Sequence, residues 1–230
     1  MKLVLIGIQG AGKSTQGNLL SRQLNLPYLS TGHIFREIAK EKTTLGRTVK
    51  EIINSGSLIP DDLTIKVVKT YLKKPEYKRG YLLDGFPRTA TQAEAFPENA
   101  VDMVIHLEIP DKEAYWRIGS QDGNIRQDNT LAAVKKRIEM FHEFTEPVIE
   151  FYRKRNKVAT IDGMKAVEEV NEEILKSLGK QLVENRIKNW KRKSKSILAI
   201  VGLPGSGKSE ASEFYEKMAA TCSRGDLSVR

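Results

Sequence analysis

Cysteine is nearly absent from this sequence, since Cys222 is the only one among 230 residues. A single cysteine excludes an internal disulfide and a cysteine-built zinc site, and it fits a reducing cytosol. Long apolar runs are also missing, because no stretch approaches the ~18 consecutive apolar residues that span a bilayer. The opening MKLVLIGI meets a glycine-rich loop at Gly7 without a small-residue cleavage site, so we interpret it as a buried strand rather than a signal peptide. We therefore expect a soluble cytoplasmic protein with no zinc and no membrane partner.

Acidic residues are scarce in the last part of the chain. The net charge is +9, and residues 186–230 hold ten Lys or Arg against four Asp or Glu. Within this tail, the run RIKNWKRKSKS at residues 186–196 has the composition of a segment that contacts RNA or another acidic surface. We favour a solvated basic linker, because Trp190 is the only aromatic residue in the run and nucleic-acid platforms use several.

Short apolar runs alternate along the chain with stretches of helical period. The runs are residues 2–7, 26–30, 81–85, 101–109 and 157–162. Strands that alternate with helices predict a five-stranded parallel sheet covered by helices on both faces, which is an α/β fold. A long helical pattern over residues 130–155 contains Pro147, where we expect a kink or a break. Another helix is predicted over residues 166–185.

The stretch GIQGAGKS at residues 7–14 satisfies the phosphate-loop pattern G-x-x-x-x-G-K-[ST]. It follows a predicted strand and precedes a helical stretch, which is the context that the mechanism needs. Glycines let consecutive N–H groups face a polyphosphate, and the helix N-terminus adds the positive end of its dipole. Lys13 would reach the β and γ phosphates of a nucleoside triphosphate, and Ser14 would ligate Mg²⁺. The fold is therefore expected to be of the P-loop NTPase type.

A second group of candidate residues follows the strand at residues 81–85. In YLLDGFPRTATQ, Asp84 ends the strand and Arg88 follows a Gly-Phe-Pro turn. Ligands of open parallel sheets bind at the carboxyl ends of the strands, so Asp84 would reach a water bound to Mg²⁺ beside the phosphate loop. Arg88 would bind a second phosphate.

The order of these motifs resembles the adenylate kinases, which are nucleoside monophosphate kinases, in their short-lid form. The resemblance rests on GIQGAGKST, STGHIFR at 30–36, NSGSLIPDD at 54–62, DGFPRTATQ, and IRQDNTLAAVKKR with TEPVIEFY, and it runs from residue 1 to about residue 180. It implies a kinase domain over residues 1–183 with a small acceptor-binding insertion at about 30–60 and a short lid at about 117–127.

The resemblance also implies the site residues. For ATP they are Gly10, Ala11, Gly12, Lys13, Ser14, Thr15, Arg117, Gly163 and Lys165. For AMP they are Thr31, Gly32, Arg36, Ser57, Leu58, Ile59, Gly85, Arg88, Gln92, Arg126 and Arg137. The residues expected to act in transfer are Lys13, Asp84, Arg88, Arg126 and Arg137. Gln92 would read the adenine edge, because its amide offers both a donor and an acceptor.

The sequence departs from the family pattern at the lid and in the acceptor segment. The arginine usual a few residues after Arg117 is missing, since Gly119, Ser120 and Gln121 occupy those positions, and His33 replaces an acid. The missing arginine predicts that charge in the transition state is less fully compensated.

A second phosphate-loop pattern, GLPGSGKS, appears at residues 202–209, but no acceptor segment or arginine lid follows it. We interpret residues 184–195 as a basic linker and residues 196–230 as an incomplete, truncated second phosphate-loop segment.

The expected reaction is ATP + AMP ⇌ 2 ADP, with Mg²⁺, in a monomer. Two alternatives stay open from the sequence. In the first, the acceptor is CMP, UMP or dTMP. In the second, the protein is a non-catalytic nucleotide sensor or an RNA-associated protein that uses its basic tail.

Overall fold

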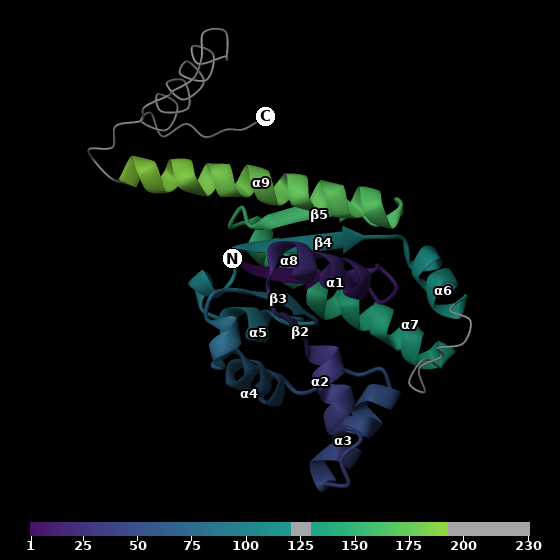
Figure 1. Ribbon diagram of the computed structural model, residues 1–230. Helices are drawn as coiled ribbons and strands as arrows, with labels where there is room; N and C mark the ends of the chain where they lie inside the picture. Colours follow the sequence, from purple (N-terminus) through teal and green to yellow (C-terminus); the bar gives the residue numbers. More distant parts are fainter. Residues whose placement is uncertain (121–129, 193–230) are drawn as a thin grey trace, which may run out of the picture. The chain divides into compact units, whose positions relative to one another are not determined.

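Parallel strands form the centre of the protein in a computed structural model that describes residues 1–120 and 130–192. The strands are β1 (Lys2–Ile6), β2 (Tyr28–Ser30), β3 (Tyr81–Asp84), β4 (Met103–Glu108) and β5 (Val158–Asp162). They pair in the order β2-β3-β1-β4-β5, and every pair is parallel (Figure 1). The predicted α/β fold with five parallel strands is confirmed.

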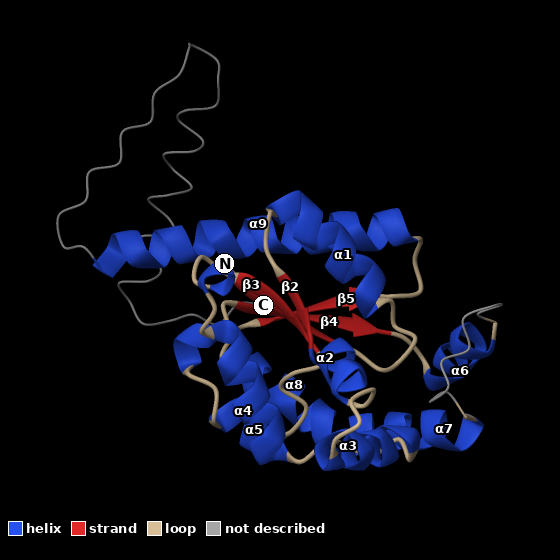
Figure 2. Cartoon of the chain, turned by 60° about the horizontal axis from the view of Figure 1, so that its bottom comes forward, coloured by secondary structure: helices blue, strands red, loops and turns tan. Residues whose placement is uncertain are grey.

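Helices connect the strands and cover both faces of the sheet (Figure 2). They are α1 (Lys13–Leu24), α2 (Thr31–Ile38), α3 (Thr44–Asn54), α4 (Asp61–Leu72), α5 (Ala90–Glu94), α6 (Asp111–Gly119), α7 (Leu131–Met140), α8 (Glu146–Arg153) and α9 (Val167–Arg192), with short helical turns η1 (Pro75–Tyr77), η2 (Glu98–Ala100) and η3 (Phe141–Thr145). Helix α1 and the start of α9 cover one face, and α4, α5 and α8 cover the other.

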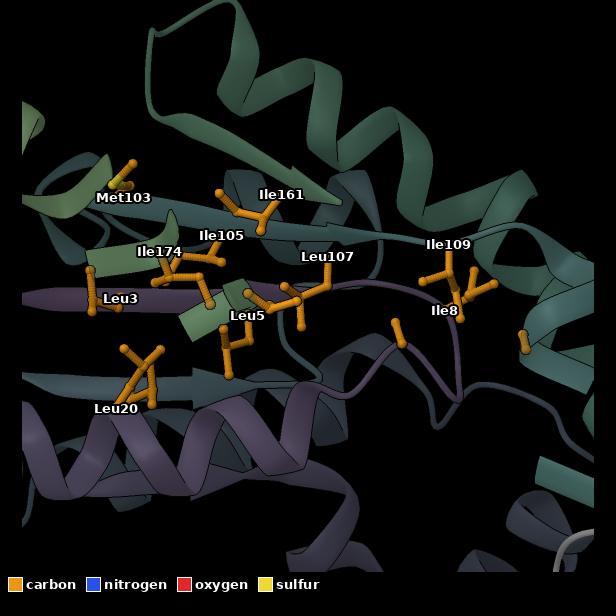
Figure 3. Packing of buried hydrophobic residues seen from close by; sticks show 14 of the residues in the cluster. Leu3, Leu5, Ile8, Leu20, Met103, Ile105, Leu107, Ile109, Ile161 and Ile174 are labelled. Atoms are coloured by element: carbon orange, nitrogen blue, oxygen red, sulfur yellow. The ribbon is translucent and has the colours of Figure 1, made fainter. Parts of the chain in front are cut away.

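The alternation of side chains along β1 divides the core into two clusters. Leu3 and Leu5 point to the face that α1 and the start of α9 cover, where Leu20 and Ile174 pack against them (Figure 3). Val4 and its neighbours on that side of the strand belong to the opposite cluster. The side chains of Leu3, Val4, Leu5, Leu20 and Ile174 are each at most 1% exposed, and burying one contributes about 1.5–3 kcal/mol. Both faces of β1 are apolar, which explains its continuous apolar run.

Two predicted helical boundaries differ from the structure. The break expected near Pro147 is a π-helical turn, η3, that precedes the proline, and Pro147 itself lies in the first turn of α8, where its missing N–H costs nothing. Helix α9 continues through Arg192 instead of ending at residue 185, and no Gly or Pro stands between residues 186 and 192 to end it there. Residues 184–192 are therefore helical, and the role of residues 184–195 as a basic linker stays a prediction.

The chain divides into two compact units, Met1–Leu178 and Gly179–Arg230. The first contains the whole sheet and the site described below. In the second, only the end of α9 is described, so the predicted phosphate loop at residues 202–209 lies outside the described residues. Among the described helices, none combines the length and the apolar character that crossing a bilayer requires.

Candidate active site

A cavity of about 710 Å³ opens at the carboxyl ends of the strands. Strands β1 and β3 are neighbours with Leu5 in register with Asp84, so the loop that follows β1 and the turn that follows β3 leave the sheet side by side. The cavity is lined by both segments, by the start of α2, by the end of α3, and by residues of α6 and α7. One cavity therefore joins the phosphate loop to the predicted acceptor segment.

The phosphate loop requires glycine for two different reasons, a close backbone contact at Gly7 and a positive φ at Gly12. A Cβ at Gly7 would lie 2.6 Å from the carbonyl oxygen of Leu107 in β4, which no side chain tolerates. Gly12 has φ of 87°, in the left-handed region, and caps the start of α1. Helix α1 then begins at Lys13, so the N–H groups of its first turn and the positive end of its dipole face the cavity.

Lys13 lies inside the ring of this loop. Its Nζ donates to the carbonyl oxygens of Gly7 and Ile8, both at 2.7 Å. The ammonium group is thereby held over the loop, where a bound polyphosphate would replace the carbonyl oxygens as its partner.

Asp84 has two differently used carboxylate oxygens. Its Oδ2 accepts hydrogen bonds from the Tyr28 hydroxyl at 2.9 Å and from the Ser30 hydroxyl at 3.4 Å. Its Oδ1 is buried and has no hydrogen-bond partner among the described residues. Burial raises the pKa of Tyr28, and the Asp84 carboxylate raises it further, so the phenol remains a proton donor. An unpaired buried oxygen is costly unless it meets a donor or a cation.

Ser14 lines the same cavity as Asp84, beside Lys13. A hydroxyl oxygen and a carboxylate oxygen that reaches through water form a donor set that suits Mg²⁺, which prefers oxygen ligands and keeps several of its waters. The residues present therefore fit a magnesium ion held with a polyphosphate.

Three arginines line the other half of the cavity: Arg36 from α2, Arg88 from the turn after β3, and Arg137 from α7. The Nε of Arg88 donates to the carbonyl oxygen of Gly85 at 2.9 Å, which fixes its guanidinium. Burial lowers the pKa of Arg88, Asp84 raises it, and Arg137 and Arg36 lower it. Because a guanidinium is not deprotonated in proteins, the three side chains keep their charge and gather positive potential where an anion would bind.

Arg137 connects α7 to both halves of the cavity. Its Nη1 donates to the Oε1 of Gln9 in the phosphate loop at 3.1 Å, and its Nη2 donates to the carbonyl oxygen of Ile53 near the end of α3 at 2.9 Å. Arg137 therefore lines the cavity, and its role in phosphoryl transfer stays a prediction.

Gln92 occupies a buried position at the start of α5, and only 2% of its surface is exposed. Its Oε1 accepts from the backbone N–H of Arg88 at 2.8 Å, and its Nε2 donates to Asp61 Oδ1 at 2.7 Å. Both ends of the amide are therefore held, and the side chain still lines the cavity.

The predicted contacts for the ATP base lie on α6 and after β5. The Nε of Arg117 donates to Glu113 Oε1 at 2.6 Å within α6. The N–H of Gly163 donates to the carbonyl oxygen of Glu108 at 2.8 Å, which holds the turn against the end of β4. Lys165 forms an ion pair with Glu173, which raises the pKa of its amine.

Every predicted site residue in the described part of the chain lines the cavity, and Arg126 lies outside the described residues. Those that line it are Gly10, Ala11, Gly12, Lys13, Ser14, Thr15, Thr31, Gly32, Arg36, Ser57, Leu58, Ile59, Asp84, Gly85, Arg88, Gln92, Arg117, Arg137, Gly163 and Lys165. The sequence did not reveal Tyr28, Gln9 or Asp61, which hold Asp84, Arg137 and Gln92. Of these, only Asp61 carried a local signal, as an acid after a proline at a helix start.

Comparison with known proteins gives one family. A model of the adenylate kinase family matches residues 5–157. The adenylate kinase of Clostridium botulinum (strain Eklund 17B / Type B) is 37% identical over 215 residues, which cover 79% of this chain and 100% of the relative. That of Thermosipho africanus is 37% identical over 209 residues, covering 76% of this chain and 98% of the relative. That of Caldicellulosiruptor bescii is 34% identical over 213 residues, covering 78% and 99%.

These alignments also show a difference in length between this chain and its relatives. The 215 positions aligned with the Clostridium botulinum protein cover only 79% of a 230-residue chain, so that relative has residues without a counterpart here.

Proposed function

The chain belongs to the adenylate kinase family and is an ATP:AMP phosphotransferase, and from this premise we propose which residues of its cavity bind ATP, which bind AMP and which contact the transferred phosphoryl group. A phosphate oxygen of AMP attacks the γ-phosphorus of ATP, and the bond from that phosphorus to the bridging oxygen breaks. Two ADP result, and the electron pair of the broken bond stays on the leaving ADP. The attacking oxygen is already anionic at neutral pH, so no general base is needed.

The phosphate loop is proposed to hold ATP. The N–H groups of Gly10, Gly12 and the first turn of α1 would bind the phosphate oxygens, and Lys13 would neutralise charge on the β and γ phosphates. Ser14 would ligate Mg²⁺ and Asp84 Oδ1 would hold one of its waters. When bound, the ion supplies positive charge to the β and γ phosphate oxygens. The unpaired buried oxygen of Asp84 supports this assignment.

The acceptor half is proposed to bind AMP. Arg36 and Arg88 would bind its phosphate bidentately, while Ser57, Leu58 and Ile59 line the base. Arg137, which contacts both halves of the cavity, would meet the phosphoryl group in transfer, with Arg126 as a further predicted contact. Positive groups around the equatorial oxygens are what a loose phosphoryl-transfer transition state requires. The observation that carries the proposal is that the phosphate loop and the arginines share one cavity.

The alternatives are less well supported. UMP and dTMP present a carbonyl and an N–H where adenine presents an amine and a bare nitrogen, so they do not match the held amide of Gln92. CMP shares the adenine pattern at that edge and must be tested. An RNA-associated role would rest on residues 186–196, and deleting residues 186–230 would then abolish a salt-dependent affinity for RNA. We propose that the protein is a monomer. We also propose that it acts in the cytoplasm, since a single cysteine fits a reducing compartment.

The test is the initial rate of nucleoside diphosphate formation from Mg-ATP with AMP, CMP, UMP, GMP or dTMP. We expect AMP to be preferred and Lys13→Ala to lower kcat/KM by about 100-fold or more, because a charge aimed at the transferred phosphate is lost. An unchanged rate in Lys13→Ala would refute the assignment of the phosphate loop, and equal rates for all acceptors would refute the role of Gln92.

A further inference from the structure

We propose that Asp61 is a positioning residue that fixes the orientation of the Gln92 amide and thereby selects the base of the acceptor nucleotide. The inference rests on the proposed function, because it names what determines specificity at the proposed AMP site. Asp61 itself would not contact the nucleotide.

Asp61 is the first residue of α4. Its two carboxylate oxygens accept hydrogen bonds from Gln92 in α5 and from Thr89, which precedes α5. Oδ1 accepts from Gln92 Nε2 at 2.7 Å, and Oδ2 accepts from the Thr89 hydroxyl at 2.9 Å. Thr89 Oγ1 in turn accepts from the N–H of Gln92 at 3.2 Å. The carboxylate therefore ties the start of α4 to the N-cap of α5 and to the side chain that α5 presents.

The amide of Gln92 can take only one orientation between these partners. A carboxylate is an acceptor only, and the backbone N–H of Arg88 on the other side is a donor only. Rotating the amide by half a turn would place its oxygen against the carboxylate and its NH₂ against an N–H. Two hydrogen bonds would become two repulsions in a buried site, where unpaired polar groups are costly.

The fixed amide of Gln92 leaves one N–H of Nε2 and one lone pair of Oε1 for the cavity, and the two cannot exchange places. Adenine matches an amide that donates to N1 and accepts from the exocyclic amine. Hypoxanthine has the same shape, but it presents N1–H and a carbonyl oxygen at these places and needs the opposite amide. A site with a fixed hydrogen-bonding pattern rejects such an analogue strongly. Inosine monophosphate is thus a probe that differs from AMP only in the pattern that Gln92 would read.

The adjacent acid, Asp62, provides a matched control. Both carboxylates lie in the first turn of α4, where each interacts with the helix dipole, but Asp62 is exposed. Asp61→Ala and Asp62→Ala therefore remove the same charge from the same turn, and only the first removes the hydrogen bonds to Gln92 and Thr89.

The experiment measures kcat and KM of the full chain for AMP and for inosine monophosphate, with equilibrium binding of both nucleotides as a second readout. In Asp61→Ala we expect the ratio of kcat/KM for AMP to that for inosine monophosphate to fall about tenfold, mainly through KM, since one of two restraints on the amide is lost. Asp62→Ala should leave the ratio within about twofold. In a Gln92→Leu background, Asp61→Ala should no longer change the ratio, because its effect passes through the amide.

Asp61→Asn covers the case in which the alanine variant does not fold. It keeps the shape and can still accept from Gln92 if its NH₂ turns toward Thr89, so we expect a ratio between those of the wild type and Asp61→Ala. An unchanged ratio in both variants, or an equal change in Asp62→Ala, would overturn the inference. A wild type that binds AMP selectively but forms no ADP would instead overturn the proposed function, while the binding ratio would still test Asp61.

Discussion

Tyr28→Phe removes one hydroxyl and leaves the packing of the ring in place. That hydroxyl donates to Asp84 Oδ2 at 2.9 Å, and the other donor to this oxygen, Ser30 Oγ, is 3.4 Å away. Because Oδ1 has no partner in the described part of the chain, the variant leaves the carboxylate with one long hydrogen bond. A hydrogen bond to a charged group contributes about 1.5–3 kcal/mol, and a protein of this size loses roughly 2–4 °C of Tm per kcal/mol.

We therefore expect Tyr28→Phe to lower the free energy of unfolding by about 2 kcal/mol and Tm by roughly 4–8 °C, as measured by guanidinium denaturation and calorimetry. The released carboxylate would also hold the proposed magnesium-bound water less well. The Mg²⁺ concentration for half-maximal rate should rise several-fold while KM for AMP stays nearly constant, because Asp84 is assigned to the metal and not to the acceptor.

Tyr77→Phe is the matched control, since Tyr77 lies in η1 and packs against the opposite cluster of the core. If Tyr28→Phe is as stable as the wild type, the hydrogen bond to Asp84 does not hold the carboxylate in the way described. If KM for AMP rises as much as the Mg²⁺ requirement, the separation of the two halves of the cavity is wrong.

Gly17→Ala should lower the free energy of unfolding by about 1–3 kcal/mol in denaturant titrations, although alanine favours helices. The reason is that the new Cβ would lie 2.7 Å from Cε2 of Tyr28 and displace its ring. A variant as stable as the wild type, or more stable, would show that the ring moves freely. The hydrogen bond that the His142 ring donates to Glu146, aided by Asp111, raises the pKa of His142. The stability that this interaction contributes is present below about pH 6.5 and is lost as pH rises through the higher folded value. The Tm of His142→Asn should be lower than that of the wild type at pH 5.5, and the two values should converge at pH 9. Burial lowers the pKa of His106, so the folded protein loses stability as pH falls below about 6.5. The free energy of unfolding of His106→Leu should therefore fall less between pH 7 and pH 5 than that of the wild type.

The sequence predicted the parts of the fold and site that depend on local patterns. The apolar runs predicted the five strands that lie in the described residues, and the phosphate loop was identified because its glycines and lysine follow one another in a fixed order. The contact between Asp61 and Gln92 spans 31 residues, and no local pattern indicates which acid meets which amide. The end of α9 was placed too early for a different reason, since a change in charge was interpreted as a change in structure.

The two carboxylates of the cavity region differ in how much of their hydrogen-bonding capacity the protein itself uses. Asp61 accepts from a side chain on each oxygen, so it holds its neighbours and has little to offer a ligand. Asp84 accepts on one oxygen, while its other oxygen is buried and has no hydrogen-bond partner in the part of the chain that the structure describes. Such an oxygen is costly, and a partner that arrives with the substrate would remove that cost. A carboxylate whose two oxygens both accept hydrogen bonds from the protein thus acts as a positioning residue, whereas a carboxylate with a buried oxygen that no described residue contacts is suited to bind a ligand. Substitutions at Asp61 should therefore change which base the site selects. Substitutions around Asp84 should change the Mg²⁺ concentration that the reaction needs.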